Sequence, residues 1–77
     1  MLHIVYLRPD GMILTKKEYR TWREIQDEYD EYRASLGPWD VEEVIAFIRT
    51  DYPSNPPFTE DEIRRFVESD EIVLYAR

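Results

Sequence analysis

The sequence predicts a small α+β domain in which a three-stranded sheet packs with three helices in the order ββαααβ. Three observations predict it. The chain has 77 residues, enough for one hydrophobic core. β-branched and aromatic runs lie near both termini, and three copies of one helix-start pattern lie between them. We therefore expect a single compact domain over residues 1–77.

The expected sheet is built from an N-terminal hairpin and a C-terminal strand. Residues 2–7 are rich in β-branched and aromatic side chains, and Arg8-Pro9-Asp10-Gly11 then predicts a turn, because proline fixes φ and glycine tolerates a left-handed conformation. Residues 12–14 return antiparallel, and residues 72–76 form the last strand. Because both faces of the first strand are apolar, we expect it to be central, with the C-terminal strand beside it, parallel or antiparallel.

Each expected helix begins with the same pattern: an apolar residue, a capping side chain, a glutamate three positions later and a second apolar residue. The cap oxygen accepts a hydrogen bond from an N–H of the first turn, and the glutamate accepts one from the cap's own N–H. The pattern predicts helices over residues 16–36, 41–51 and 60–69. Its three copies are Leu14-Thr15 with Glu18-Tyr19, Trp39-Asp40 with Glu43-Val44, and Phe58-Thr59 with Glu62-Ile63.

Apolar side chains recur at helical spacing in each predicted helix and indicate one buried face. Gly37-Pro38 is expected to end the first helix, and the prolines of residues 53–57 separate the second helix from the third. The expected core faces are Trp22, Ile25, Tyr29, Tyr32 and Leu36 on the first helix, Val41, Val44, Ile45, Ile48 and Tyr52 on the second, and Ile63, Phe66 and Val67 on the third.

Little in the sequence supports catalysis, so we expect a protein that is not an enzyme. The only histidine, His3, lies in the first strand, and the serines lie outside any nucleophile motif. Two glycines cannot form a glycine-rich phosphate loop. With no cysteine and no calcium-loop spacing among the acidic residues, we expect no metal site and no cofactor.

Hydropathy predicts a soluble, cytoplasmic protein. No apolar run is long enough to span a bilayer, and the N-terminal residues lack the pattern of a secretory signal peptide. We therefore expect no membrane association.

The seventeen acidic residues fall into groups with different explanations. Seven of them lie in the first turn of a predicted helix, where the helix dipole and the caps favour them. Five others lie within residues 24–31, with no basic residue in 24–32. We call these five the acidic face: Glu24, Asp27, Glu28, Asp30 and Glu31.

A group of basic residues precedes the acidic face, and we call it the basic patch: Arg8, Lys16, Lys17, Arg20 and Arg23. Bases at the start of a helix and acids at its end oppose the helix dipole, and the acidic face contains like-charge i,i+4 pairs. Residues 1–23 carry five bases and two acids (net +3), whereas residues 24–77 carry five bases and fifteen acids (net −10). This charge pattern is unfavourable for a helix, and nothing in the sequence offsets its cost, which favours a functional surface. The alternative is a solvated face that maintains solubility.

Three functions fit this arrangement. In the first, the protein is an inhibitor or regulator whose acidic face occupies a basic, nucleic-acid-binding surface of a target protein, because clustered carboxylates imitate phosphate charge. In size and charge the chain is similar to small phage-encoded inhibitors of host enzymes, including anti-restriction and anti-CRISPR proteins. In the second, the protein is an adaptor or homodimer in which the basic half of the first helix meets the acidic half in a second copy. In the third, the basic patch binds nucleic acid, which the net charge of −7 disfavours.

Overall fold

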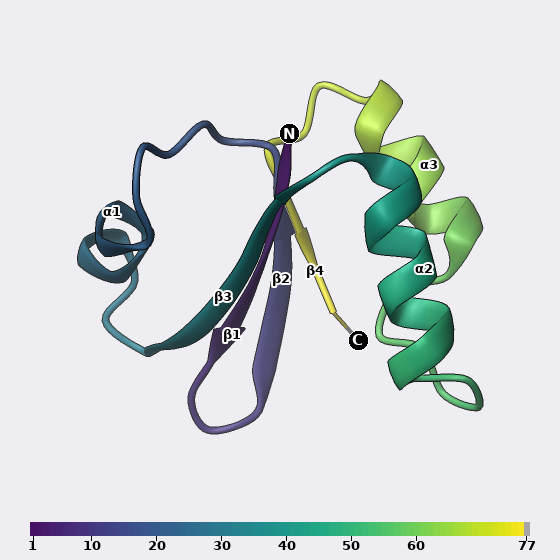
Figure 1. Ribbon diagram of the computed structural model, residues 1–77, viewed down its shortest axis with the longest axis horizontal. Helices are drawn as coiled ribbons and strands as arrows, with labels where there is room; N and C mark the ends of the chain where they lie inside the picture. Colours follow the sequence, from purple (N-terminus) through teal and green to yellow (C-terminus); the bar gives the residue numbers. More distant parts are fainter. Residues whose placement is uncertain (77) are drawn as a thin grey trace.

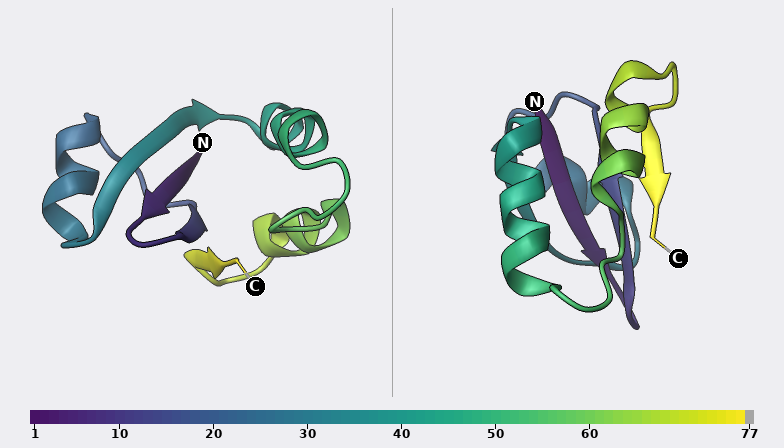
Figure 2. Two further views of the ribbon diagram at one scale, coloured as in Figure 1. Left: turned by 90° about the horizontal axis from the view of Figure 1, so that it is seen from below. Right: turned by 90° about the vertical axis from the view of Figure 1, so that its right-hand side faces the viewer.

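A computed structural model describes residues 1–76 and shows a sheet between two layers of helix (Figure 1). The elements in chain order are β1 (Leu2–Leu7), β2 (Gly11–Thr15), α1 (Trp22–Glu28), β3 (Tyr32–Trp39), α2 (Val41–Asp51), α3 (Glu60–Glu68) and β4 (Val73–Tyr75). The four strands form one antiparallel sheet in the order β3-β1-β2-β4. Figure 2 shows α1 on one face of this sheet and α2 with α3 on the other.

The α+β class, the three helices and the N-terminal hairpin are confirmed, but the number and order of the strands are not. The structure has four strands and the order ββαβααβ, not three strands and ββαααβ. β1 is central as expected, because β3 and β2 pair with its two edges. The expectation that the C-terminal strand lies beside β1 was wrong, since β4 pairs antiparallel with β2 through Ile13 and Tyr75.

The first predicted helix, over residues 16–36, was wrong in most of its length. Only Trp22–Glu28 is helical, and the chain then enters β3, so Gly37-Pro38 lies within a strand and does not end a helix. The aromatic and apolar residues at 29, 32 and 36 fit a helical spacing, but a strand here pairs with an edge of β1 that would otherwise stay open. A register shift in this pairing between Tyr6 and Leu7 lets Tyr32 and Leu36 pack on opposite faces of the sheet.

Two of the three predicted capping boxes are confirmed. Asp40 accepts from the Glu43 N–H at 2.8 Å and its own N–H donates to Glu43 at 3.0 Å. Thr59 and Glu62 make the same pair of bonds at α3. The third box was wrong: Thr15 is the fully buried last residue of β2, and its Oγ1 accepts from the Lys17 N–H at 3.1 Å.

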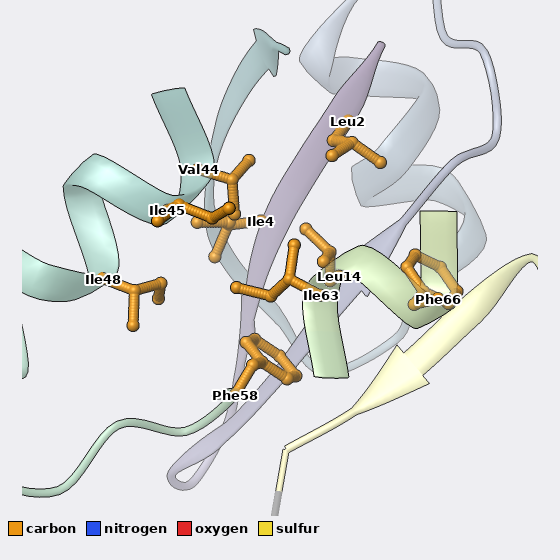
Figure 3. Close-up of a cluster of buried hydrophobic side chains, with 9 residues drawn as sticks. All are labelled: Leu2, Ile4, Leu14, Val44, Ile45, Ile48, Phe58, Ile63 and Phe66. Carbon is orange, nitrogen blue, oxygen red and sulfur yellow. The ribbon is translucent and has the colours of Figure 1, made fainter. Parts of the chain in front are cut away.

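The main core lies between the sheet and the helix pair α2 and α3 (Figure 3). It confirms the buried faces predicted for these helices, except that Val67 is 37% exposed. Leu2, Ile4 and Leu14 of the sheet meet Val44, Ile45, Ile48, Phe58, Ile63 and Phe66.

The opposite face of the sheet is covered more thinly. Its cluster of buried residues is Val5, Ile13 and Ile25, so α1 contributes one fully buried side chain. Trp22, which the helical spacing placed in the core, is 52% exposed. This short helix leaves part of the sheet face uncovered, between α1 and β3.

Candidate binding surfaces around α1

The structure gives two residues of the acidic face a structural task. Glu24 accepts a hydrogen bond from the Arg20 N–H at 2.7 Å and so ties the first turn of α1 to the residue before its N-cap, Thr21. Glu28 forms an ion pair with Lys17 and accepts from the Tyr19 hydroxyl at 2.9 Å. The hydrogen bond from Lys17 holds the pKa of the Glu28 carboxyl below its ordinary value. These two carboxylates therefore fasten α1 to the segment that precedes it.

The other three residues of the acidic face are exposed and without an ion pair in residues 1–76, and we call them the free carboxylates: Asp27, Asp30 and Glu31. Asp27 lies in the last turn of α1, and Asp30 and Glu31 lie in the turn into β3. The structure thus keeps these three together on one surface segment, which the sequence analysis had placed on a continuous helix.

The basic patch is not one surface. Lys16 donates from Nζ to the carbonyl oxygens of Phe66 and Ser69, at the end of α3. Lys17 is paired with Glu28, and the Arg23 guanidinium lies 5.5 Å from the centre of the Trp22 ring.

Arg8 and Arg20, the remaining members of the basic patch, lie together with Arg33 around an open recess between α1 and β3, which we call the arginine recess. Its volume is about 670 Å³, and it is lined by His3 together with residues from Arg8, 19–26 and 32–38. No acidic residue lines it, although the chain has 17. Arg33 was not among the predicted site residues, because residue 33 fell near the end of the helix predicted over residues 16–36.

The three guanidinium groups of the arginine recess form no ion pair and no side-chain hydrogen bond within residues 1–76. By contrast, Lys17, Arg49, Arg64 and Arg65 are all ion-paired. The arginine recess is therefore a locally positive site in a protein of net charge −7.

His3 lines the arginine recess from β1 and is only 6% exposed. Its ring meets Tyr19 edge-on, with the ring centres 5.4 Å apart, and its Nδ1 is buried without a hydrogen-bond partner in the described chain. Burial lowers the pKa of His3 from its ordinary value of 6.5, so the ring is neutral at about pH 7.

Two further observations concern metal ligands and helix length. Within residues 1–76, no group of three or more metal-ligating side chains is placed to hold a metal ion. In the same part of the chain, no helix has the length and apolar character needed to cross a bilayer.

Comparisons with protein-family models, with curated proteins and with solved structures give no match. The function is therefore inferred from the chemistry of the free carboxylates and of the arginine recess.

Proposed function

We propose that the protein is a non-enzymatic inhibitor or regulator that binds a basic, nucleic-acid-binding surface of a target protein through its free carboxylates. The observation that supports the proposal is the relation between Arg8 and Glu31. The Arg8 N–H donates to the Glu31 carbonyl oxygen at 2.8 Å, and yet the two side chains form no ion pair. Two opposite charges thus lie on neighbouring residues without forming an ion pair, and both stay available to a partner.

A run of acidic residues without a basic residue among them differs from the charge pattern that solubility requires. A surface that only maintains solubility is served by interspersed charges of both signs. Here the free carboxylates occupy residues 27–31, and the nearest basic residue after them, Arg33, lines the recess. The result is a negative segment, residues 27–31, directly before the strand that supplies Arg33 to the arginine recess.

The free carboxylates suit a basic partner for two reasons. Their spacing on a helix end and a tight turn presents several negative charges at once, as a nucleic-acid backbone does. Long-range attraction to a basic surface speeds association and makes it sensitive to salt. Glu24 and Glu28 add to the negative potential while they hold α1 in place.

The short helix α1 does not support self-association through an antiparallel pair of long helices. It requires a helix with a basic first half and an acidic second half, whereas α1 covers only Trp22–Glu28 and Lys16 and Lys17 are occupied within the chain. We expect a monomer in sedimentation at micromolar concentration, at both low and high salt. A dimer that dissociates in high salt would favour the adaptor or homodimer function instead.

The proposal is tested by capture from an extract of the cells that naturally contain the protein. The three baits are the wild type, the variant D27N/D30N/E31Q, and the control D51N/E68Q/D70N, which removes the same charge from exposed residues elsewhere. We expect the wild type and the control to retain the same basic protein, and duplex DNA to release it.

Two results would contradict the proposal. Equal capture by D27N/D30N/E31Q would show that the free carboxylates are not the interface. A captured protein that duplex DNA does not displace would show that the occupied surface is not one that binds nucleic acid.

A further inference from the structure

We infer that the arginine recess is a binding site for a small molecule that carries a phosphate group. This inference goes beyond the proposed function and does not depend on it, because it uses different residues. It rests on the charges around the recess and on its size and aromatic lining.

The charges favour a multiply charged anion. Arg8, Arg20 and Arg33 line one cavity that no acidic residue lines, and none of the three forms an ion pair within the described chain. Three like charges around one space repel each other, and a bound dianion removes that repulsion. The planar guanidinium group donates two parallel hydrogen bonds to phosphate or carboxylate oxygens. Three such groups match a phosphate dianion better than a single carboxylate.

His3 forms part of the wall of the recess and adds no charge to it. It is 6% exposed and lines the recess, and its Nδ1 is fully buried without a hydrogen-bond partner in residues 1–76. Because burial lowers the pKa of His3, the positive charge around the recess comes from the three arginines.

The size and lining of the recess indicate a phosphate ester and not inorganic phosphate alone. About 670 Å³ is within the range of small-molecule pockets and far larger than one phosphate ion. Trp22 lines the recess and is 52% exposed, with its ring stacked on Tyr32 at 6.4 Å between centres. The organic part of an ester would cover this exposed aromatic surface.

A nucleic-acid strand fits less well than a small ligand. The molecule carries a net charge of −7. The free carboxylates lie directly before β3, the strand that supplies Arg33. A long polyanion would meet that negative surface, whereas a small monoester interacts chiefly with the local positive charge.

The two tryptophans allow a direct test, because they lie on opposite faces of the sheet. Trp22 lines the recess, and Trp39 packs on Phe47 at 5.4 Å against the main core. In a titration followed by the two indole N–H signals in NMR, the probes are inorganic phosphate, glucose 6-phosphate and adenosine monophosphate, with acetate at matched ionic strength. We expect the Trp22 signal to shift saturably with the phosphate compounds, more tightly with the esters, while Trp39 stays unchanged.

Variants locate the binding site. Arg33→Gln and Arg20→Gln should each weaken ester binding by at least about tenfold, because each removes a charged hydrogen-bond donor. Arg65→Gln removes the same charge from an exposed pair with Asp61, and it should leave binding unchanged. The variant D27N/D30N/E31Q should also keep ester binding, so that failure of this inference and failure of the proposed function are distinguishable.

Four results would overturn the inference. They are the absence of a saturable shift with any ester at millimolar concentration, equal shifts with acetate, equal affinity in Arg33→Gln and Arg65→Gln, and binding of a single-stranded oligonucleotide far more tightly than of the mononucleotide. The last result would assign the recess to a nucleic-acid strand.

Discussion

Lys16 and Phe66 meet twice: the Lys16 Nζ donates to the Phe66 carbonyl oxygen at 2.9 Å and lies 4.7 Å from the centre of the Phe66 ring. The same Nζ donates to the Ser69 carbonyl oxygen at 2.7 Å. The Phe66 carbonyl oxygen also accepts from the Ser69 N–H at 3.1 Å, and a cation at the end of a helix interacts favourably with the helix dipole. Lys16 therefore joins the end of β2 to the end of α3, and its function is structural.

Replacing this lysine should destabilise the fold. We expect Lys16→Met to lower the free energy of unfolding by about 1–2 kcal/mol, because it removes charged hydrogen bonds to two carbonyl groups. Urea denaturation measures the change. The control Arg65→Met breaks an exposed i,i+4 pair and should cost about 0.5 kcal/mol or less. Equal losses in the two variants would contradict the structural role of Lys16.

The capping boxes of α2 and α3 should each be worth measurable stability, and the absent third box should not. Asp40→Ala and Thr59→Ala are expected to cost about 0.5–2 kcal/mol each, since they leave an N–H of the first turn without its acceptor. Glu18→Ala should change stability by less than about 0.5 kcal/mol, because the ion pair that Glu18 forms with the N-terminal ammonium group is exposed. Thermal unfolding of the three variants measures these changes. A large loss of stability in Glu18→Ala would indicate that Thr15 and Glu18 do form a capping box.

Gly37 should resist substitution where Gly11 does not. Gly37 has φ +115°, and a Cβ atom there would lie 2.5 Å from the Leu2 carbonyl oxygen. A Cβ at Gly11 would meet the Leu7 side chain at an ordinary 3.5 Å. We expect Gly37→Ala to cost at least about 2 kcal/mol and Gly11→Ala less than half as much, measured by urea denaturation. A similar loss of stability in both variants would mean that Gly37 of β3 does not lie this close to the Leu2 carbonyl group of β1.

Stability should fall as the pH is lowered below about 6.5, because of His3. Burial lowers its pKa, the N-terminal ammonium group lowers it further, and Glu18 opposes both. The unfolded chain therefore binds a proton at a higher pH than the folded chain, so acidification between about pH 7 and 5 favours unfolding. The free energy of unfolding, measured by urea denaturation at several pH values in this range, should change less with pH in His3→Phe than in the wild type. The same change of the free energy of unfolding with pH in both proteins would show that His3 is not the group responsible.

The sequence predicts α2 and α3 well because their starts are defined by local chemistry. Asp40 with Glu43 and Thr59 with Glu62 specify each start within four residues, and the apolar spacing after each cap specifies the buried face. The hairpin is equally local, since its strands flank the turn at Pro9 and Gly11.

The first helix and β3 could not be separated in this way. Tyr29, Tyr32 and Leu36 satisfy a helical spacing, and only the unpaired edge of β1, more than twenty residues earlier, favours a strand at 32–39. The same long-range pairing determines the sites. The negative charge of residues 24–31 is visible in the sequence, whereas Arg33 joins Arg8 and Arg20 only because β3 pairs with β1.

The central claim is that the free carboxylates are the surface on which a basic partner is recognised. The most direct measurement is the association rate constant between the protein and the purified captured partner, at about 50, 150 and 500 mM salt. We expect a rate that falls steeply with salt in the wild type and in D51N/E68Q/D70N, and a slower, nearly salt-independent rate in D27N/D30N/E31Q. A D27N/D30N/E31Q variant that keeps the rate and the salt dependence of the wild type would contradict the claim.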